Sequence, residues 1–464
     1  MKTSKIKVLV TVLTIYGMLF PVAGFSGQKT VTRPNILFIF ADDWGYGDLG
    51  CYGNTEVKTP HIDRLASEGT MFTGFHTTSG VCSPSRTSVI TGHFPARHRI
   101  HGHFAGNELN ARRGMPNWLN ENLPFYLPRL LQEAGYVTAH FGKWHLGGGG
   151  EPNGDLKAPV PALYGYHETR VWNGNGPTWN GDQLWPETRY MDDDTVWVQN
   201  SSRLAVDATI DFISRNSGGA PFFVNLWLKD PHTPLWPSDE QRRPYKGIEP
   251  DKETYYSVLT DADHHIGRLL DALKKMELDE NTLVIFSSDN GPAHYPPGLT
   301  AGSTGGLKGR KAHIYQGGVN VPFIVRWPGN VGAGKTDSTS VLSAVDLLPT
   351  FCALAGKELP ENYRPDGEDF SSIFANTPFL RTKPLFWDWR FAVESETPGR
   401  ENQWPSMAVR KGKWKLLANS ARTRIELYNM ENDRFESVNL AAKNGDKVKE
   451  LMELWDNWKS ELPK

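Results

Sequence analysis

The chain has 464 residues, with 50 Lys and Arg against 52 Asp and Glu, so its formal net charge is −2 when the histidines are neutral. This balance lacks the basic excess typical of nucleic-acid-binding proteins, and three cysteines are too few for a disulfide-rich scaffold. The length allows a large hydrophobic core with a smaller second unit.

Residues 1–26 are predicted to be a signal peptide. Lysines precede an apolar run from Val8 to Phe20, and small residues follow near Ala23 and Ser26. The run is short for a membrane-spanning helix, so an uncleaved anchor is the second choice. We therefore expect a periplasmic or secreted protein with no membrane span after signal cleavage.

Four apolar runs are predicted to be buried strands, and helical patterns lie between them. The runs are Asn35–Phe40, Tyr136–Phe141, Phe222–Leu228 and Thr282–Ser287, and two of the helical segments are Leu127–Ala134 and Tyr255–Lys274. Strands that alternate with helices indicate an α/β fold, in which helices sandwich a large, mostly parallel sheet.

Each of these strands is followed by polar residues that suit a binding site. In chain order they are Asp42 and Asp43, Lys143 and His145, His232, and Asp289 and Asn290. Ligands bind beyond the carboxyl ends of strands in open parallel sheets, so we expect these residues to converge on one edge. The carboxylate and amide oxygens among them favour Ca²⁺ or Mg²⁺ over Zn²⁺.

A cysteine lies at a predicted helix start. Pro84 suits the first turn of a helix that begins near Cys82, and Arg86 adds a positive charge about one turn later. A helix N-terminus next to a cation lowers the pKa of a thiol or holds an anion. The spacing between Cys82 and Arg86 differs from that of cysteine phosphatases.

The motif Cys82-x-Pro84-x-Arg86 resembles the signature of the type I, formylglycine-dependent sulfatases of the alkaline-phosphatase-like superfamily. Further motifs occur in the order that this family uses. They are Asp42-Asp43, Gly142-Lys143-Trp144-His145-Leu146-Gly147, Pro231-His232-Thr233-Pro234, Ser288-Asp289-Asn290-Gly291 and Lys311-x-x-x-Tyr315-x-Gly317-Gly318. The resemblance extends from about Pro34 to the C-terminus.

The resemblance implies a division of the chain into a catalytic α/β domain, residues 33–375, and a small C-terminal subdomain, residues 376–464. Strands are predicted within Met407–Leu417 and at Glu426–Met430, and a helix is predicted from about Lys447 to Leu462. These elements are similar to the four-stranded antiparallel subdomain with a terminal helix that closes sulfatases.

The resemblance also implies the chemistry of residue 82. A modification system would oxidise Cys82 to formylglycine, and the hydrated aldehyde, a gem-diol, would attack the sulfur of a sulfate ester. One Ca²⁺ ion, with Mg²⁺ as the less favoured alternative, would assist it. The ligands that the family pattern implies are Asp42, Asp43, residue 82, Asp289 and Asn290.

Roles for the remaining residues follow from the same resemblance. Lys143 and Lys311 would hold sulfate oxygens, and Arg86 would hold the diol. His232 is the candidate general acid, a task that it could share with Lys311, and His145 is the candidate base for sulfate release.

Two details of the Lys311 motif need comment. Lys308 is an alternative to Lys311, but the spacing to Tyr315 favours Lys311. Many relatives carry Glu before the Gly-Gly pair, where this chain has Gln316.

The expected substrate is a sulfated carbohydrate. Trp172, Trp179, Trp185 and Trp197 fall in a loop-like segment where exposed rings could stack on sugars, although most tryptophans belong to cores. The segment from Arg97 to His103, with Arg112-Arg113 beyond it, is either a set of subsites for an anionic polymer or a solvated loop.

Two other functions and one disulfide stay open on the sequence alone. A phosphate or phosphonate monoester hydrolase on the same scaffold is one alternative, and a non-catalytic sulfated-glycan binding protein is the other. Cys51 and Cys352 either pair or remain free thiols.

Overall fold

The predicted strands form the centre of a mixed sheet. The computed structural model describes residues 33–147, 158–172, 195–294, 300–389 and 405–463, and residues from Arg33 onward pack as one unit. Within these residues the sheet has nine strands: β1 (Asn35–Ala41), β2 (Thr70–His76), β3 (Val137–Lys143), β4 (Glu168–Trp172), β5 (Phe222–Trp227), β6 (Thr282–Ser288), β7 (Asn320–Arg326), β8 (Lys335–Asp337) and β9 (Leu342–Ser343).

The strand order is β4-β3-β5-β1-β6-β7-β2-β8, and β9 pairs with β2. The strands β4, β3, β5, β1 and β6 are parallel, whereas β7 is antiparallel to both β6 and β2. The carboxyl ends of β1, β3, β5 and β6 therefore meet at one edge. This arrangement confirms the prediction of a mixed, mostly parallel sheet.

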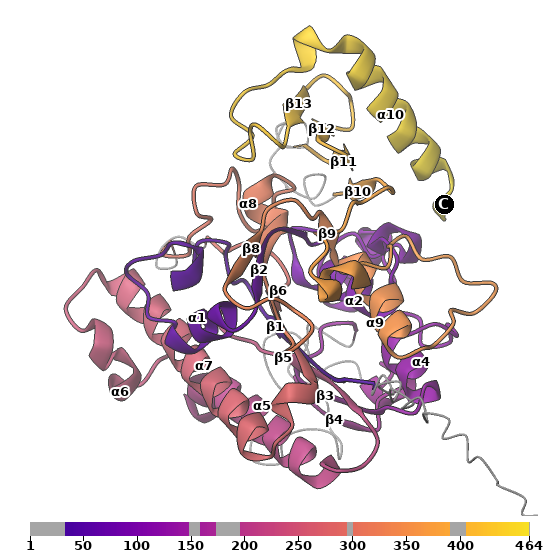
Figure 1. Ribbon diagram of the computed structural model, residues 1–464. Helices are drawn as coiled ribbons and strands as arrows, with labels where there is room; N and C mark the ends of the chain where they lie inside the picture. Colours follow the sequence, from indigo (N-terminus) through magenta and orange to yellow (C-terminus); the bar gives the residue numbers. More distant parts are fainter. Residues whose placement is uncertain (1–32, 148–157, 173–194, 295–299, 390–404, 464) are drawn as a thin grey trace, which may run out of the picture. The chain divides into compact units, whose positions relative to one another are not determined.

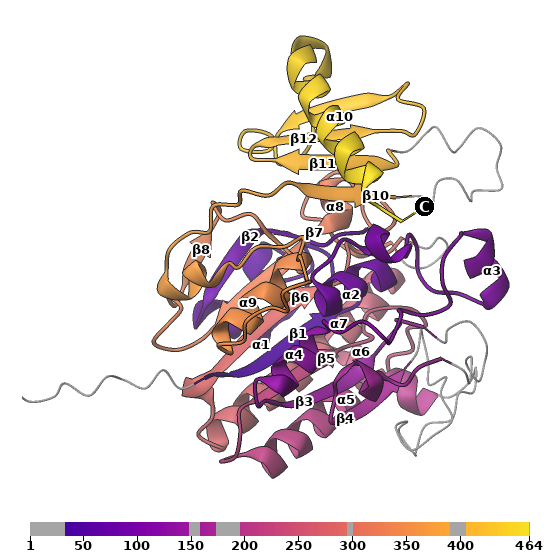
Figure 2. The same ribbon diagram turned by 90° about the vertical axis from the view of Figure 1, so that its right-hand side faces the viewer.

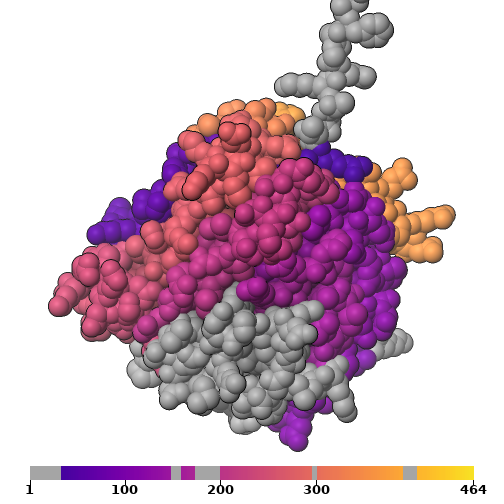
Figure 3. Space-filling view, turned by 90° about the horizontal axis from the view of Figure 1, so that it is seen from below, coloured from indigo at the N-terminus to yellow at the C-terminus, as the bar shows by residue number. Residues whose placement is uncertain are grey.

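Helices cover both faces of the sheet (Figures 1 and 2). One apolar core joins the sheet to α2, α4 and α9, and a second joins its other face to α1, α5 and α7. Figure 3 shows the surface of α5 and α7 in magenta and salmon. The helices are α1 (Pro60–Ser67), α2 (Cys82–Thr91), α3 (Asn107–Arg112), α4 (Leu127–Glu133), α5 (Thr195–Asn216), α6 (Asp239–Arg242), α7 (Pro250–Lys275), α8 (Gln316–Val319) and α9 (Leu347–Leu354).

A small antiparallel sheet follows near the C-terminus. Its strands are β10 (Leu385–Asp388), β11 (Met407–Lys411), β12 (Trp414–Ala418) and β13 (Ile425–Asn429), in that order, and α10 (Gly445–Ser460) packs on it. Its apolar core includes Phe94, Ile314 and Val319 of the preceding chain. The division at residues 375 and 376 stays a prediction.

The predicted signal peptide lies outside the described residues. Among the helices that are described, none combines the length and the apolar character that crossing a bilayer requires.

Candidate active site

The acidic residues after β1 and β6 lie at adjacent strand ends. β1 and β6 pair in register up to Ala41 and Ser288, which brings the residues that follow together. The backbone N–H of Asp43 donates to Asp289 Oδ1 at 3.2 Å. Asp43 has a φ of 65°, in the left-handed region that a non-glycine residue rarely adopts. Such strain is typical of functional sites, where surrounding contacts enforce it.

Three buried carboxylates each contact a cation, and we call these six residues the carboxylate–cation cluster. Lys143 Nζ forms an ion pair with Asp42, and Lys311 Nζ lies 2.6 Å from Asp43 Oδ1. Arg86 donates from Nε and Nη2 to one oxygen of Asp289, at 3.0 and 2.7 Å. The members are Asp42, Asp43, Asp289, Arg86, Lys143 and Lys311.

Burial and the neighbouring charges set the pKa values of the cluster. Burial raises the pKa of Asp42, but the charges of Lys143 and Arg86 outweigh it and hold the pKa well below its usual range. Burial, followed by the charge of Asp42, raises the pKa of Asp289 to about 7. The cluster thus contains one carboxylate that is firmly ionised and one that is poised near neutral pH.

Cys82 is the first residue of α2 and faces the cluster. Its Sγ lies 3.4 Å from Asp42 Oδ1 and 3.6 Å from Lys143 Nζ. Burial and then the charge of Asp42 raise the pKa of the thiol. The helix N-terminus therefore does not produce the thiolate that its charge alone would favour.

The segment that carries Lys311 and α8 approaches the residues that follow β6, and the N–H of Lys311 donates to the Pro292 carbonyl at 3.1 Å. The N–H of Gly291 donates to the carbonyl of Gly318 at 2.9 Å, and a Cβ on Gly291 would lie only 1.8 Å from the Gly317 oxygen. Only glycine fits position 291. Lys308, the alternative lysine, instead contacts Tyr428 at 2.9 Å and Glu426 at 3.4 Å.

The donor set fits a hard cation. Asn290 donates from Nδ2 to Asp43 Oδ1 at 2.7 Å, while its buried Oδ1 has no hydrogen-bond partner among the described residues. An unpartnered buried oxygen next to carboxylates suits a cation ligand. Asp42, Asp43, Cys82 and His232 also place one ligand atom each within 4.8 Å of one another.

The two predicted acid–base histidines are buried and differ in orientation. His232 Nδ1 lies 2.8 Å from the Thr233 carbonyl, and Nε2 faces Asp43 Oδ2 at 3.9 Å. His145, with a φ of 51°, directs Nε2 to the Phe104 carbonyl at 3.2 Å, and its Nδ1 has no partner in the described part of the chain. Burial, and then nearby lysines, hold both pKa values well below the usual range.

Two buried residues next to the site were not singled out from the sequence. Lys229 Nζ donates to the carbonyls of His232 and Pro234 at 2.7 and 2.8 Å. His140 Nε2 lies 3.1 Å from the Lys143 carbonyl. The position of Lys229 directly after an apolar strand could have indicated a functional role. No feature of the sequence indicated one for His140.

Several residues weighed in the sequence lie elsewhere. Trp172 ends β4 and is fully buried, so the expectation of an exposed ring there is wrong: the strand runs through the core. Cys51 and Cys352 are both free, and they pack in cores on opposite faces of the sheet. Trp179 and Trp185 lie outside the described residues, as does the side chain of Trp197.

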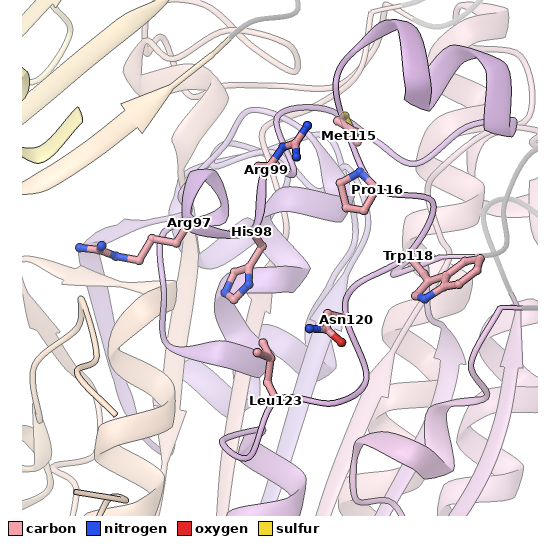
Figure 4. A pocket seen from close by; sticks show the side chains of 8 residues that line it. All are labelled: Arg97, His98, Arg99, Met115, Pro116, Trp118, Asn120 and Leu123. Atoms are coloured by element: carbon pink, nitrogen blue, oxygen red, sulfur yellow. The ribbon is translucent and has the colours of Figure 1, made fainter. Parts of the chain in front are cut away.

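The cationic segment after α2 lines a pocket of about 380 Å³ (Figure 4). Arg97 points away from Arg99 and Trp118 in that view and forms an ion pair with Asp366 at 2.8 Å. Asp366 therefore neutralises the charge of Arg97 within the protein. Trp118 pairs with Gly147, just beyond His145.

Comparison with known proteins gives consistent matches. Residues 34–357 match the model of the Sulfatase family, and residues 309–460 match N-sulphoglucosamine sulphohydrolase, C-terminal. The chain is 28% identical to an N-acetylgalactosamine-6-O-sulfatase of Bacteroides thetaiotaomicron, over 94% of each chain. It is 32% identical to the N-acetylgalactosamine-6-sulfatase of Homo sapiens, over 78% of this chain and 70% of the relative.

Among solved structures, the crystal structure of Ps i-CgsB in complex with k-i-k-neocarrahexaose is similar to the whole described unit. The TM-score is 0.75 at 27% identity, and the match covers 92% of this chain and 93% of the other.

Proposed function

The chain belongs to the sulfatase family and is a sulfuric ester hydrolase of the alkaline-phosphatase-like fold, and we propose that it is an exported, formylglycine-dependent enzyme that removes sulfate from a carbohydrate. The observation that carries this proposal is the position of Cys82, at the start of α2 and in contact with Asp42 and Lys143. A nucleophile derived from residue 82 would meet a bound sulfate ester next to fixed cations.

The environment of Cys82 supports its conversion to formylglycine. Burial and Asp42 raise the pKa of the thiol, so the unmodified side chain is a poor nucleophile at neutral pH. As hydrated formylglycine, residue 82 would supply an oxygen nucleophile for sulfur and a route for sulfate release. We therefore propose that a formylglycine-generating system acts on this chain.

One Ca²⁺ ion is the proposed metal. Its proposed ligands are oxygens of Asp42, Asp43, Asp289 and Asn290, together with residue 82, and the unpartnered Asn290 Oδ1 supports this assignment. Oxygen-only ligands suit Ca²⁺, with Mg²⁺ second. The bound ion would supply positive charge for the nucleophile and the sulfate group.

Lys143 and Lys311 are proposed to hold the sulfate oxygens, and Arg86 to orient the nucleophile. Burial keeps water from screening the charges of Arg86 and Lys143, which strengthens their effect on a developing anion. His145 Nδ1 carries a free lone pair because Nε2–H donates to Phe104, which suits a base. His232 is the proposed general acid for the leaving oxygen.

The proposed substrate class rests on the named relatives. They include N-acetylgalactosamine-6-sulfatases and a protein solved in complex with a neocarrahexaose. A sulfated oligosaccharide or polysaccharide is therefore the substrate class that we propose. The predicted signal peptide at residues 1–26 supports a periplasmic or secreted location.

Parallel assays on an aryl sulfate, an aryl phosphate and defined sulfated oligosaccharides test the proposal. We expect sulfate release from the first and from at least one oligosaccharide, with aryl phosphate much slower. Preferred turnover of aryl phosphate would favour the phosphatase alternative, and binding without turnover would favour a glycan-binding protein.

The active sample should also be analysed for its modification and its metal. Mass spectrometry of the peptide that contains residue 82 should show oxygen in place of sulfur. Elemental analysis should find about one Ca²⁺ per chain. A fully active sample with an intact thiol would rule out the proposed nucleophile.

A further inference from the structure

A second cavity, which shares no lining residue with the carboxylate–cation cluster, lies between the main sheet and the small antiparallel sheet. Its volume is about 780 Å³, and its walls come from β2, α8, the start of β7 and the turn between β11 and β12. Figures 1 and 2 both show α8 and β2 below the small sheet. No lining residue belongs to the cluster or is one of the proposed metal ligands. The cavity is therefore a separate feature of the surface.

The lining of this cavity carries an excess of positive charge. Arg381 is already neutralised, because it forms ion pairs with Asp346 and Glu368. The charged lining residues are Arg381, Arg410, Lys413 and Arg434, against the single carboxylate of Glu431.

Arg410 is the central cation: it forms no direct ion pair with a carboxylate of the described residues, although the charges of Glu436 and Glu431 act on it. Its Nη1 lies 3.0 Å from His76 Nε2, and its Nε donates to the Gly412 carbonyl at 3.3 Å. Burial, followed by the charge of Arg381, lowers the pKa of Arg410 to about 10. Glu436 and Glu431 offset only part of the effect of burial on the pKa of Arg410, and a bound anion would offset more of it.

Two further buried groups in the cavity lack partners. Gln316 is 1% exposed, and its Nε2 has no partner in the described structure. Its Oε1 lies 3.2 Å from His76 Nε2, which cannot donate to it while it accepts from Arg410. Asn320 is 4% exposed and has an unpartnered Oδ1. Buried amide groups without partners are rare in folded proteins and indicate a ligand or bound water. The cavity therefore places an unpartnered donor, Gln316 Nε2, and an unpartnered acceptor, Asn320 Oδ1, among the residues that line it with Arg410.

The cavity also offers apolar surface at its edge. Phe435 and Leu380 line it and are exposed. Arg434 Nη2, which is buried without a hydrogen-bond partner within the described ranges, belongs to a guanidinium 5.9 Å from the Phe435 ring centre. An aromatic face next to cations is the usual combination for a charged sugar, because the ring covers the apolar face of the sugar while the cations bind its acidic group.

We propose that this cavity is a second glycan site, which binds a sulfate or carboxylate group of a saccharide through Arg410 and Gln316 while the catalytic cluster acts on another unit. This inference rests on the proposed function in one respect, because that function identifies the ligand as a sulfated carbohydrate. The acidic group would lie against Arg410 and the Gln316 amide, and sugar hydroxyls would donate to Asn320 Oδ1. Such a site would anchor a long substrate rather than take part in ester cleavage.

The substitution Gln316→Glu tests the site with almost no change in shape. The new carboxylate would lie against His76 and next to Arg410, where it would pair with the guanidinium and repel an anion. Gln132→Glu is the matched control, because Gln132 is exposed and its side chain bonds His167 at 2.9 Å, away from the cavity. Lys413→Ala, at the exposed β11–β12 turn, is a second variant that does not disturb the core.

Binding of a sulfated tetrasaccharide and of inorganic sulfate is measured by calorimetry on the full chain with Cys82→Ser, which prevents turnover. We expect one tetrasaccharide that contacts both sites, at least about tenfold weaker binding with Gln316→Glu, and a smaller loss at low salt with Lys413→Ala. A tetrasaccharide affinity in Gln316→Glu equal to that of the parent chain would overturn the proposal. Inorganic sulfate that binds as tightly as the tetrasaccharide would also overturn it.

Turnover separates this inference from the proposed function. In the Cys82 protein, Gln316→Glu should lower kcat/KM on the tetrasaccharide roughly tenfold or more and leave aryl sulfate hydrolysis unchanged. An equal loss on both substrates would assign Gln316 to the catalytic site and contradict the inference. If the unaltered chain cleaves neither ester, the proposed function fails, while the affinity difference between the parent chain and Gln316→Glu still decides whether the cavity binds the saccharide.

Discussion

Replacing Arg86 with methionine removes the cation that holds Asp289, and the structure allows the cost to be worked out. The guanidinium donates twice to Asp289, lies 3.5 Å from Asp42 and also donates to the Lys143 carbonyl at 3.2 Å. All of these groups are buried. Deleting one partner of a buried ion pair costs about 3–5 kcal/mol, because the other charge is left uncompensated.

This cost corresponds to a measurable fall in melting temperature. The entropy of unfolding is about 2.1 cal/mol/K per residue. For a unit of roughly 430 residues, the free energy of unfolding therefore changes by about 0.9 kcal/mol per degree near Tm. We therefore expect Arg86→Met to lower Tm by roughly 3–6 °C. Calorimetry in EDTA measures the protein without a divalent ion that could replace the lost charge.

The control is an exposed ion pair of similar chemistry. Arg203 contacts Asp207 at 3.2 Å on the surface of α5, so Arg203→Met should change Tm by less than about 1 °C. The loss in Arg86→Met should be larger at pH 8 than at pH 6. Arg86 lowers the pKa of Asp289, which is about 7 with Arg86 present, so the variant has a higher pKa and must take up a proton at pH 8 that both proteins already bind at pH 6. Equal Tm values for the two variants would refute the reasoning.

Three further outcomes are expected. Burial lowers the pKa of His140 to about 3 in the folded chain. Between pH 3 and 6.5 the unfolded chain therefore binds more protons than the folded chain, and the free energy of unfolding falls as the pH falls through that range. In denaturant titrations, His140→Gln should reduce the loss between pH 7 and pH 4 by roughly 2–3 kcal/mol, and an unchanged pH dependence would contradict this. Lys229→Met should remove the hydrogen bonds to the carbonyls of His232 and Pro234, and it should lower kcat on aryl sulfate at least tenfold with little change in KM. An unaltered kcat would show that Lys229 does not position His232. His145→Ala should release one equivalent of alcohol in a burst while sulfate release slows, and a folded variant with neither effect would remove His145 from the reaction.

The strands that carry the site could be predicted because they are uniformly apolar. The run Asn35–Phe40 corresponds to β1, and Thr282–Ser287 corresponds to β6 within one residue. β7 was not identified, and its Pro322 explains this, because proline in an apolar run argues against a central strand. The structure accommodates Pro322 opposite a register shift between Phe72 and Phe75 of β2.

The convergence of the polar residues was predictable, but their pairing was not. Parallel strands bring their carboxyl ends to one edge, which is a property of sequence pattern and topology. Whether Lys143 contacts Asp42 or Asp289 depends on side-chain geometry at the scale of one ångström. The buried Lys229 and His140 were missed for a related reason, since a single polar residue near a strand end is ordinarily a solvated side chain.

The carboxylate–cation cluster explains why a metal and a sulfate group would bind together. Its three acidic and three basic residues already balance one another, so either ligand alone would leave the buried site with a net charge. A cation that takes over the carboxylates of Asp42 and Asp43 would free Lys143 and Lys311 for an anion. The lysines that neutralise the cluster without ligands are then the same groups that would hold the sulfate. Each ligand therefore offsets the charge that the other introduces, and their affinities are expected to be coupled.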